Sequence, residues 1–208
     1  MPGRPFGLVL AGGLARRMEG RDKTLLRLDP ATTLLDALHG RLCTQCAALA
    51  ISANGDPARF ATAGLPVLPD RPGPSRGPLA GVLAGLEHAA AAAPEGWMLT
   101  VPGDTPFVPP DLSFRLMAAA EAQKVPVARA TYAGRIHALV ALWSCRLAEP
   151  LRQALFDRDQ RKVTAFQAEA GVVDVPWPER AYDPFSNVNT PADLAEARAL
   201  QARLVATR

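Results

Sequence analysis

Cysteine, histidine and long apolar runs are all scarce in this sequence of 208 residues. The three cysteines and three histidines are too few and too scattered to favour a zinc site, although Cys43 and Cys46 spell a Cys-x-x-Cys pair. We interpret this pair as small apolar residues on a buried face of a helix expected at 33–47. His39 and His88 fall in helical patterns, so no convincing Ser/His/Asp or Cys/His set for nucleophilic catalysis is present.

An excess of charge of one sign is also missing. The net charge is +3, with 23 lysines and arginines against 20 acidic residues, which is too even to predict wrapping around a nucleic acid. No apolar stretch approaches the ~20 residues that a membrane span requires, and the first residues do not resemble a signal peptide. We therefore expect a cytoplasmic protein that binds neither nucleic acid nor membranes.

Length and composition predict one compact domain over 1–208. A chain of this size buries about 70% of the surface that its unfolded form exposes. Hydrophobic residues make up 49% and charged residues 21%, values that are typical of a globular enzyme or binding domain, and the sequence contains no internal repeat.

Strand-like and helical patterns alternate through the first two thirds of the chain. The strand-like runs are 6–10, 49–53, 67–68 and 97–101, and the helical patterns are 33–47, 79–92 and 111–123. This alternation predicts a mostly parallel sheet covered by helices on both faces, an α/β sandwich.

The pattern changes after the third of these helices. Two strand-like runs, 125–131 and 135–143, are separated by three residues and predict a hairpin that adds an antiparallel edge to the sheet. Helical patterns at 146–156 and 161–170 then precede a short apolar run at 172–175. A last helix is expected from Pro191, with Thr190 as its N-cap and Asp193 in its first turn.

The stretch LAGGLARRMEGRDK, residues 10–23, directly follows the first expected strand. Gly12 and Gly13 allow close approach of the backbone to a ligand, while Arg17 and Lys23 are among four cations that supply positive charge. These features suit a nucleoside triphosphate site, but the residue pattern matches neither a Rossmann fingerprint nor a P-loop. The alternative is a surface loop with a solvated basic face.

Two further motifs carry candidate ligands. In VPGDTPF, Asp104 directly follows an apolar strand and is well placed to coordinate Mg²⁺ that carries nucleotide phosphates; the alternative is an aspartate that caps a turn. In FSNVNTP, Asn187 and Asn189 present both amides on one side of an extended segment that leads into a helix N-terminus. Their side chains either bind a phosphorylated substrate or form hydrogen bonds with backbone groups of the loop.

The Pro- and Gly-rich stretch PDRPGPSRGP, residues 69–78, is too short for an interdomain linker and is better explained as a ligand loop. Together with the three motifs above, and in the same order and spacing, it resembles the molybdenum cofactor guanylyltransferase (MobA-type) family over nearly the whole chain. The resemblance implies a Rossmann-like, three-layer α/β/α nucleotidyltransferase that transfers GMP from Mg-GTP to the terminal phosphate of molybdopterin (Mo-molybdopterin) and releases pyrophosphate.

The resemblance also implies roles for individual residues. Lys23 and Arg17 would stabilise charge at the α-phosphorus and Asp104 would hold Mg²⁺, while Asn187 and Asn189 match positions proposed for the pterin substrate. The remaining positions that match the nucleotide-binding part, about 6–107, are Leu10, Ala11, Gly12, Gly13, Asp70, Gly77, Pro78 and Leu79. The acceptor-binding part would be about 108–208, with Asn187 and Asn189 across the cleft from the opening stretch. Transient contact with molybdopterin-synthesis proteins and molybdoenzyme chaperones is expected.

Some positions depart from the family pattern. Ser52 stands where relatives have an asparagine, and Asn54 follows two residues later, so either one could contact the nucleotide. Glu19 replaces a glycine in the opening stretch, Gly103 replaces a cysteine before the metal aspartate, and His137 begins a pair that is more usually proline-containing.

Three alternatives to the guanylyltransferase remain open. A cytidylyltransferase for the same pterin typically has alanine at the position of Gly12, so the glycine here favours guanine. Sugar-nucleotide pyrophosphorylases are usually longer and lack the paired asparagines. A non-catalytic nucleotide-binding regulator would have no need of Asp104.

Overall fold

The computed structural model describes residues 3–11, 22–70 and 77–206. The strands are β1 (Phe6–Leu10), β2 (Ala48–Ser52), β3 (Val67–Leu68), β4 (Trp97–Pro102), β5 (Val127–Tyr132), β6 (Arg135–Ser144) and β7 (Val172–Pro176). The α-helices are α1 (Leu34–Leu42), α2 (Pro78–Ala92), α3 (Leu112–Gln123), α4 (Ala148–Phe156), α5 (Val163–Ala170) and α6 (Pro191–Ala206). The 3-10 turns are η1 (Lys23–Leu25), η2 (Pro57–Ala63) and η3 (Cys145–Leu147). All the elements expected from the sequence are present; β1 and β3 have the predicted bounds, α6 has the predicted start, and the others differ at one or both ends.

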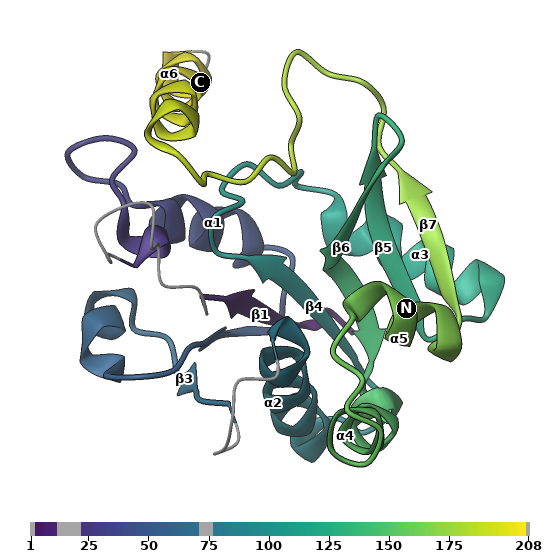
Figure 1. The fold of residues 1–208 in the computed structure, drawn as a ribbon. Helices are drawn as coiled ribbons and strands as arrows, with labels where there is room; N and C mark the ends of the chain where they lie inside the picture. Colours follow the sequence, from purple (N-terminus) through teal and green to yellow (C-terminus); the bar gives the residue numbers. More distant parts are fainter. Residues whose placement is uncertain (1–2, 12–21, 71–76, 207–208) are drawn as a thin grey trace.

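One seven-stranded sheet, in the order β3-β2-β1-β4-β6-β5-β7, forms the centre of the molecule (Figure 1). Strands β1 to β4 pair in parallel, and β7 pairs in parallel with β5. Only β6, among the described strands, runs antiparallel to its neighbours β4 and β5. The predicted mostly parallel sheet with a hairpin is confirmed. The hairpin lies inside the sheet and not at its edge, because β7 pairs along the outer side of β5.

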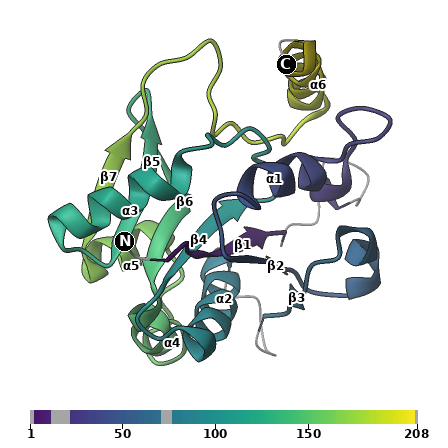
Figure 2. The ribbon, with the colours of Figure 1, turned by 180° about the vertical axis from the view of Figure 1, so that it is seen from behind.

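Helices cover both faces of this sheet and complete the α/β/α sandwich, as the two opposite views in Figures 1 and 2 show. Helices α1 and α3 bury apolar side chains against one face, in a core that includes Leu38, Leu116 and Ile51. Helices α2, α4 and α5 cover the other face. There Leu8 of β1 and Trp143 of β6 are fully buried.

Glycine lets α2 pack closely on the sheet. A Cβ atom added at Gly85 would overlap the side chain of Leu8 and also press on Met98, so the helix backbone lies directly on β1 and β4. This close approach fixes the position of α2, whose N-terminus lies near the ends of these strands.

Helix α1 ends earlier than the sequence predicts, at Leu42 and not near residue 47. The reason is a tertiary contact made by the buried side chain of Gln45. Its amide donates to the carbonyls of Arg41 and Pro109, and its oxygen accepts from the N–H of Ser113. These bonds satisfy the end of α1 and divert the chain toward β2.

Helix α6 packs outside the sandwich, next to the first turn of α1 (Figure 1). Leu194, Ala197 and Leu200 of α6 join Leu34 of α1 and Val188 in a separate apolar cluster. Its predicted start is confirmed, since α6 begins at Pro191. Within the described ranges, no helix combines the length and the apolar character needed to cross a membrane.

Candidate active site

The carboxyl ends of three neighbouring parallel strands meet at one edge of the sheet. Leu10 of β1 pairs in register with Ser52 of β2 and with Pro102 of β4. Two backbone hydrogen bonds extend this alignment beyond the strands: Ala11 N–H donates to Ser52 O at 2.9 Å, and Gly103 N–H donates to Leu10 O at 3.0 Å. Open α/β sheets bind ligands outside such ends, so the loops that leave this edge form the candidate site.

Asp104 is held in a turn directly after β4. The turn is closed by a 3.0 Å bond from Thr105 N–H to Pro102 O, and Thr105 is fully buried. The Nδ2 atom of Asn187 donates to Asp104 Oδ1 at 2.6 Å and to Thr105 Oγ1 at 3.2 Å. The N–H of Val188 also donates to the backbone carbonyl of Asp104, at 2.9 Å. The carboxylate is therefore fixed through both its backbone and its side chain.

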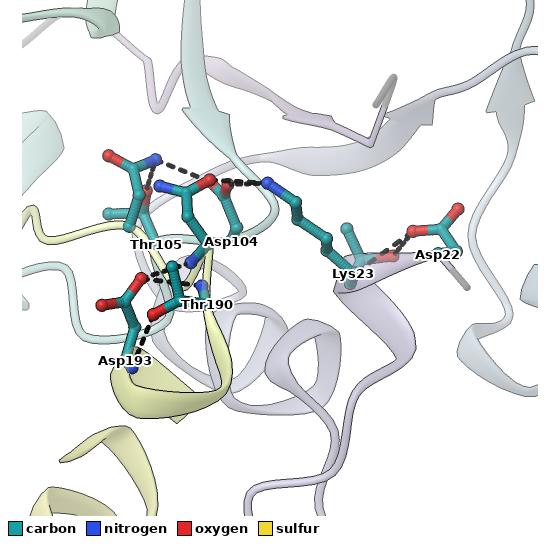
Figure 3. A network of polar contacts seen from close by, with 9 residues as sticks. Asp22, Lys23, Asp104, Thr105, Thr190 and Asp193 are labelled. Atoms are coloured by element: carbon teal, nitrogen blue, oxygen red, sulfur yellow. Dashed lines mark hydrogen bonds and ion pairs between the residues drawn. The ribbon is translucent and has the colours of Figure 1, made fainter. Parts of the chain in front are cut away.

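Lys23 reaches the same carboxylate from another loop. It begins η1, a turn capped by Asp22, whose Oδ1 accepts from the N–H of Thr24 at 3.1 Å. The Nζ atom of Lys23 donates to Asn189 Oδ1 at 2.5 Å and lies 3.7 Å from Asp104 Oδ2. Figure 3 shows the Lys23 side chain extending from its turn toward Asp104. The sequence-predicted cation and carboxylate thus form an ion pair, although they lie in separate motifs.

Gly103 allows the turn that carries Lys23 to approach β4. A Cβ atom on Gly103 would overlap Cγ2 of Thr24, which is itself buried. The hydroxyl of Thr24 donates to Asp22 Oδ1 at 2.7 Å, so the threonine side chain is held in this position. The glycine, where the family resemblance leads one to expect a cysteine, therefore helps bring Lys23 to Asp104.

A capping box at the start of α6 orders Asn189. Asp193 Oδ2 accepts from the N–H groups of Asn189 and Thr190 at 2.8 and 2.9 Å, and Asp193 N–H donates to Thr190 Oγ1 at 3.2 Å. These bonds lower the pKa of Asp193, and the bond from Asn189 N–H has the largest effect. The amide of Asn189 contacts Lys23 at the end of the opening stretch, and its placement across the cleft from that stretch stays a prediction.

Asn54 and Asp70 form a reciprocal pair at the ends of β2 and β3. Asn54 Nδ2 donates to Asp70 Oδ2 at 2.8 Å, and Asp70 N–H donates to Asn54 Oδ1 at 2.9 Å. Ser52, in contrast, is buried beneath α2, where a Cβ atom on Gly81 would overlap its hydroxyl oxygen. Of the two positions that the sequence left open, Asn54 is the one whose side chain is exposed beside Asp70.

Gly77, Pro78 and Leu79 form the N-terminus of α2. Gly77 is the N-cap residue with φ +72°, a backbone conformation that favours glycine, and Pro78 occupies the first helical position. Leu79 is fully buried in the core beneath α2, so it supports the start of the helix from within.

Three predicted site residues, Gly12, Gly13 and Arg17, lie in the segment 12–21, outside the described residues. Glu19, the departure from the family pattern in this stretch, lies there as well. The assignments of these residues stay predictions from the sequence.

His137 is a buried residue of β6. Its ring lies 5.1 Å from that of Phe185, and its Nε2 atom is 3.9 Å from Asp183 Oδ2 and makes no hydrogen bond to any described residue. Burial lowers the pKa of His137, so the neutral imidazole is favoured.

The cysteines do not form a metal site among the described residues, where no group of three His, Cys, Asp or Glu side chains could hold a metal ion. Cys43 is exposed at the end of α1, whereas Cys46 is buried beyond it. Burial raises the pKa of the Cys46 thiol to about 12, which keeps it protonated and unreactive.

Sequence reasoning missed Arg59, which lies beside the site on η2. Its guanidinium forms an ion pair with Asp22, with 3.1 Å between Nε and Oδ2. No motif marks it, because its partner is 37 residues away and belongs to a different loop.

A lysine, a carboxylate and two amides therefore meet at the carboxyl edge of a mostly parallel sheet. Mg²⁺ is usually bound through one or two carboxylates together with substrate phosphates, so the single carboxylate of Asp104 fits this requirement. Lysine and main-chain donors suit the phosphates themselves. This fold and site define an α/β enzyme that acts on the phosphate chain of a nucleotide.

The chain belongs to the MobA-like NTP transferase family, whose domain model matches residues 7–172. It is therefore an enzyme of the nucleotidyltransferase type, and such enzymes generally use a divalent metal ion. A molybdenum cofactor guanylyltransferase of Rhodopseudomonas palustris (strain BisB5) is 50% identical over 197 residues, 94% of this chain and 93% of the relative. One from Bradyrhizobium sp. (strain ORS 278) is also 50% identical, over 94% of this chain and 92% of its own length.

A solved structure shares the fold at lower sequence identity. The molybdopterin-guanine dinucleotide biosynthesis protein A from Archaeoglobus fulgidus superimposes with a TM-score of 0.74 and is 23% identical. The match covers 95% of this chain and 99% of that protein, so the whole sandwich is common to both.

Proposed function

We propose that this protein transfers GMP from Mg-GTP to the terminal phosphate of molybdopterin (Mo-molybdopterin), forming the guanine dinucleotide cofactor and releasing pyrophosphate. The names of the relatives at 50% identity supply the reaction. In this chain the supporting observation is a set of contacts: Lys23 contacts Asn189 and Asp104, and Asp104 accepts a hydrogen bond from Asn187.

The chemistry requires little from the protein beyond positioning and charge. The attacking group is a phosphate monoester with a second pKa near 6, so it is already largely ionised at neutral pH and needs no general base. Transfer is an in-line displacement at the α-phosphorus, in which pyrophosphate leaves. Lys23 and Arg17 stabilise the charge that develops on the phosphate oxygens.

Asp104 would hold Mg²⁺, which when bound neutralises charge on the triphosphate. Asn187 keeps one carboxylate oxygen of Asp104 in a fixed direction through its 2.6 Å bond. Asn189 likewise holds the ammonium group of Lys23 in place, by accepting a hydrogen bond from it. Because an ammonium has three N–H donors, Lys23 can retain Asn189 and still donate to a phosphate oxygen.

We divide the site into a nucleotide-binding part, about 6–107, and an acceptor-binding part, about 108–208, of one domain. The nucleoside would lie along the carboxyl edge, near Asn54 and Asp70, with the proposed contacts completed by Leu10, Ala11, Gly12, Gly13, Gly77 and Pro78. The buried Ser52 and Leu79 would support this edge from beneath. Asn187 and Asn189 would also face the acceptor phosphate, since their segment joins the second part to Lys23 and Asp104.

GTP and Mo-molybdopterin are the substrates in this proposal. Molybdopterin-synthesis proteins would deliver the acceptor and molybdoenzyme chaperones would receive the product, through transient contacts. We place the reaction in the cytoplasm, and the three free cysteines are consistent with such a reducing compartment.

Pyrophosphate release provides the test. The purified protein is incubated with Mo-molybdopterin and each of the four nucleoside triphosphates in turn, with and without Mg²⁺. We expect release only with GTP, only with Mg²⁺ and only when the acceptor is present. Equal or faster release with CTP would contradict the assignment of guanine, and release without the pterin would contradict the acceptor.

A further inference from the structure

Arg59 lies between the two ends of the proposed nucleotide site, which are Lys23 at the phosphate end and the Asn54–Asp70 pair at the nucleoside end. It belongs to η2, the turn that links β2 to β3. Its guanidinium carbon lies 4.5 Å from the ring centroid of Phe60, which is buried in the core. This contact gives the arginine a rigid platform, although 29% of its own side chain remains exposed.

The guanidinium donates to three acceptors that come from separate positions. Nε donates to Asp22 Oδ2 at 3.1 Å, Nη1 donates to the carbonyl of Asp56 at 2.6 Å, and Nη2 donates to the carbonyl of Asn54 at 2.7 Å. The planar, forked geometry of arginine makes such a three-way contact possible, and a lysine could not reproduce it.

Each end of this contact is linked to a proposed substrate-binding residue. At one end, Asp22 caps the turn that begins with Lys23, the residue for the phosphates. At the other end, Asn54 exchanges two hydrogen bonds with Asp70, the pair proposed for the nucleoside. Arg59 thus connects the phosphate end and the nucleoside end through one rigid group.

Arg59 also balances the negative charge of Asp22 beside Lys23. Asp22 is adjacent in sequence to Lys23, and only 12% of its side chain is exposed. Without the guanidinium, this carboxylate would compete with the phosphates for the lysine, because unlike charges at short range attract strongly where water is partly excluded.

We propose that Arg59 is a positioning residue for nucleotide binding: it fixes the spacing between Lys23 and the Asn54–Asp70 pair. The inference rests on the proposed function for the identity of the nucleotide and for the two ends at which its phosphates and its nucleoside bind. It predicts that Arg59 matters most for a ligand that spans both ends, such as GTP, and little for guanosine, which reaches one end.

Contacts other than those of Arg59 also hold the local fold. Asp56 caps η2 by accepting from Ala58 N–H at 2.8 Å, and Gly64 ends the turn with φ +63°. Phe60 supplies the apolar anchor. The substitution Arg59→Met keeps the length and the apolar stem of the side chain, so it removes the three polar contacts with little change in packing.

Direct binding of GTP and of guanosine to the protein, measured by calorimetry, tests the proposal independently of transfer activity. We expect Arg59→Met to weaken GTP binding by about tenfold, the scale of a lost charge-assisted contact, and guanosine binding by no more than about twofold. Arg152→Met is the matched control, because Arg152 pairs with Glu149 on the exposed side of α4. It should leave both affinities unchanged.

A cycle with Lys23→Ala gives a second readout that a general loss of structure would not produce. If Arg59 acts by positioning Lys23, Arg59→Met should weaken GTP binding far less in the Lys23→Ala background than in the parent protein. Equal penalties for GTP and guanosine, or additive penalties in the cycle, would overturn the proposal.

Arg59→Lys covers the case in which Arg59→Met does not fold. This variant keeps the positive charge but cannot reach all three acceptors. We expect it to bind GTP more tightly than Arg59→Met but several-fold more weakly than the parent protein. Parental affinity in Arg59→Lys would overturn the proposal. A parent protein that binds GTP but transfers no GMP would contradict the proposed function alone.

Discussion

The amide Nδ2 atom of Asn187 lies 2.6 Å from Oδ1 of Asp104, although the two residues are 83 positions apart in the chain. The bond fixes the rotation of the carboxylate, and its other oxygen faces Lys23 at 3.7 Å. One oxygen of Asp104 is therefore committed to the protein, and the other is directed toward the place where phosphates and metal would bind.

Asp104→Asn should abolish most of the transfer activity without unfolding the protein. The change keeps the shape of the side chain but removes the anionic ligand, so turnover should fall by about 100-fold or more, equivalent to ~3 kcal/mol. Steady-state pyrophosphate release at several Mg²⁺ concentrations measures the loss. Glu149→Gln on α4 is the control and should keep parental turnover; full Mg²⁺-dependent activity in folded Asp104→Asn would refute the metal assignment.

Asn187→Ala and Asn189→Ala should each lower kcat and not only the affinity for molybdopterin. Each change removes a hydrogen bond to a charged group, Asp104 or Lys23, and such bonds are worth ~1.5–3 kcal/mol. We expect kcat to fall by about tenfold or more with both substrates saturating. If kcat is unchanged and only the KM for molybdopterin rises, the amides serve the acceptor alone.

Two glycine-to-alanine changes in helices should have opposite effects on stability. Gly85→Ala places a methyl group against Leu8 and Met98, so the free energy of unfolding should fall by ~1–3 kcal/mol. Gly40→Ala, at an exposed position of α1 with open space around it, should raise it by ~0.5–1 kcal/mol. Urea denaturation measures both changes, and destabilisation by Gly40→Ala would show that the difference does not come from packing.

His137 should make the folded protein less stable at acidic pH. Burial lowers the folded-state pKa of His137 below its ordinary value of 6.5; Asp183 opposes this shift and Arg135 adds to it. The unfolded state therefore binds the proton first, so the stabilising effect of the neutral ring is complete above about pH 6.5 and declines as the pH falls toward the folded pKa.

Thermal unfolding at pH 8 and at pH 5.5 tests this dependence. The parent protein should lose more stability between the two values than His137→Gln, which cannot titrate. The same loss in both proteins would assign the effect to other groups.

Most of the architecture could be predicted from local patterns. Alternating strand and helix periodicities predicted the α/β/α sandwich. Thr190, Pro191 and Asp193 predicted the start of α6, because capping depends on residues close in sequence. The end of α1 could not be predicted, since it depends on contacts of Gln45 with residues 64 and 68 positions away. The inner position of the hairpin likewise depends on β7, which pairs with β5 only after two helices have intervened.

The candidate site shows the same division. Asp104, Asn187 and Lys23 each stand in a short motif, so the sequence indicated them one by one. Their mutual contacts could not be derived, because three loops must first be brought to one edge of the sheet. Arg59 has no motif at all, and only its folded position shows its partners.

Gly103 and Thr24 cannot vary independently during evolution. A Cβ atom at position 103 would overlap Cγ2 of Thr24, which is buried and cannot move aside without losing its bond to Asp22. A lineage that gains a cysteine in place of Gly103 must therefore carry a smaller residue, such as glycine, in place of Thr24. An alignment of the family should show the two positions covarying, with a larger residue at only one of them. A lineage that passed from Gly103 with Thr24 to the cysteine form should have changed position 24 first, and a lineage that passed the other way should have changed position 103 first.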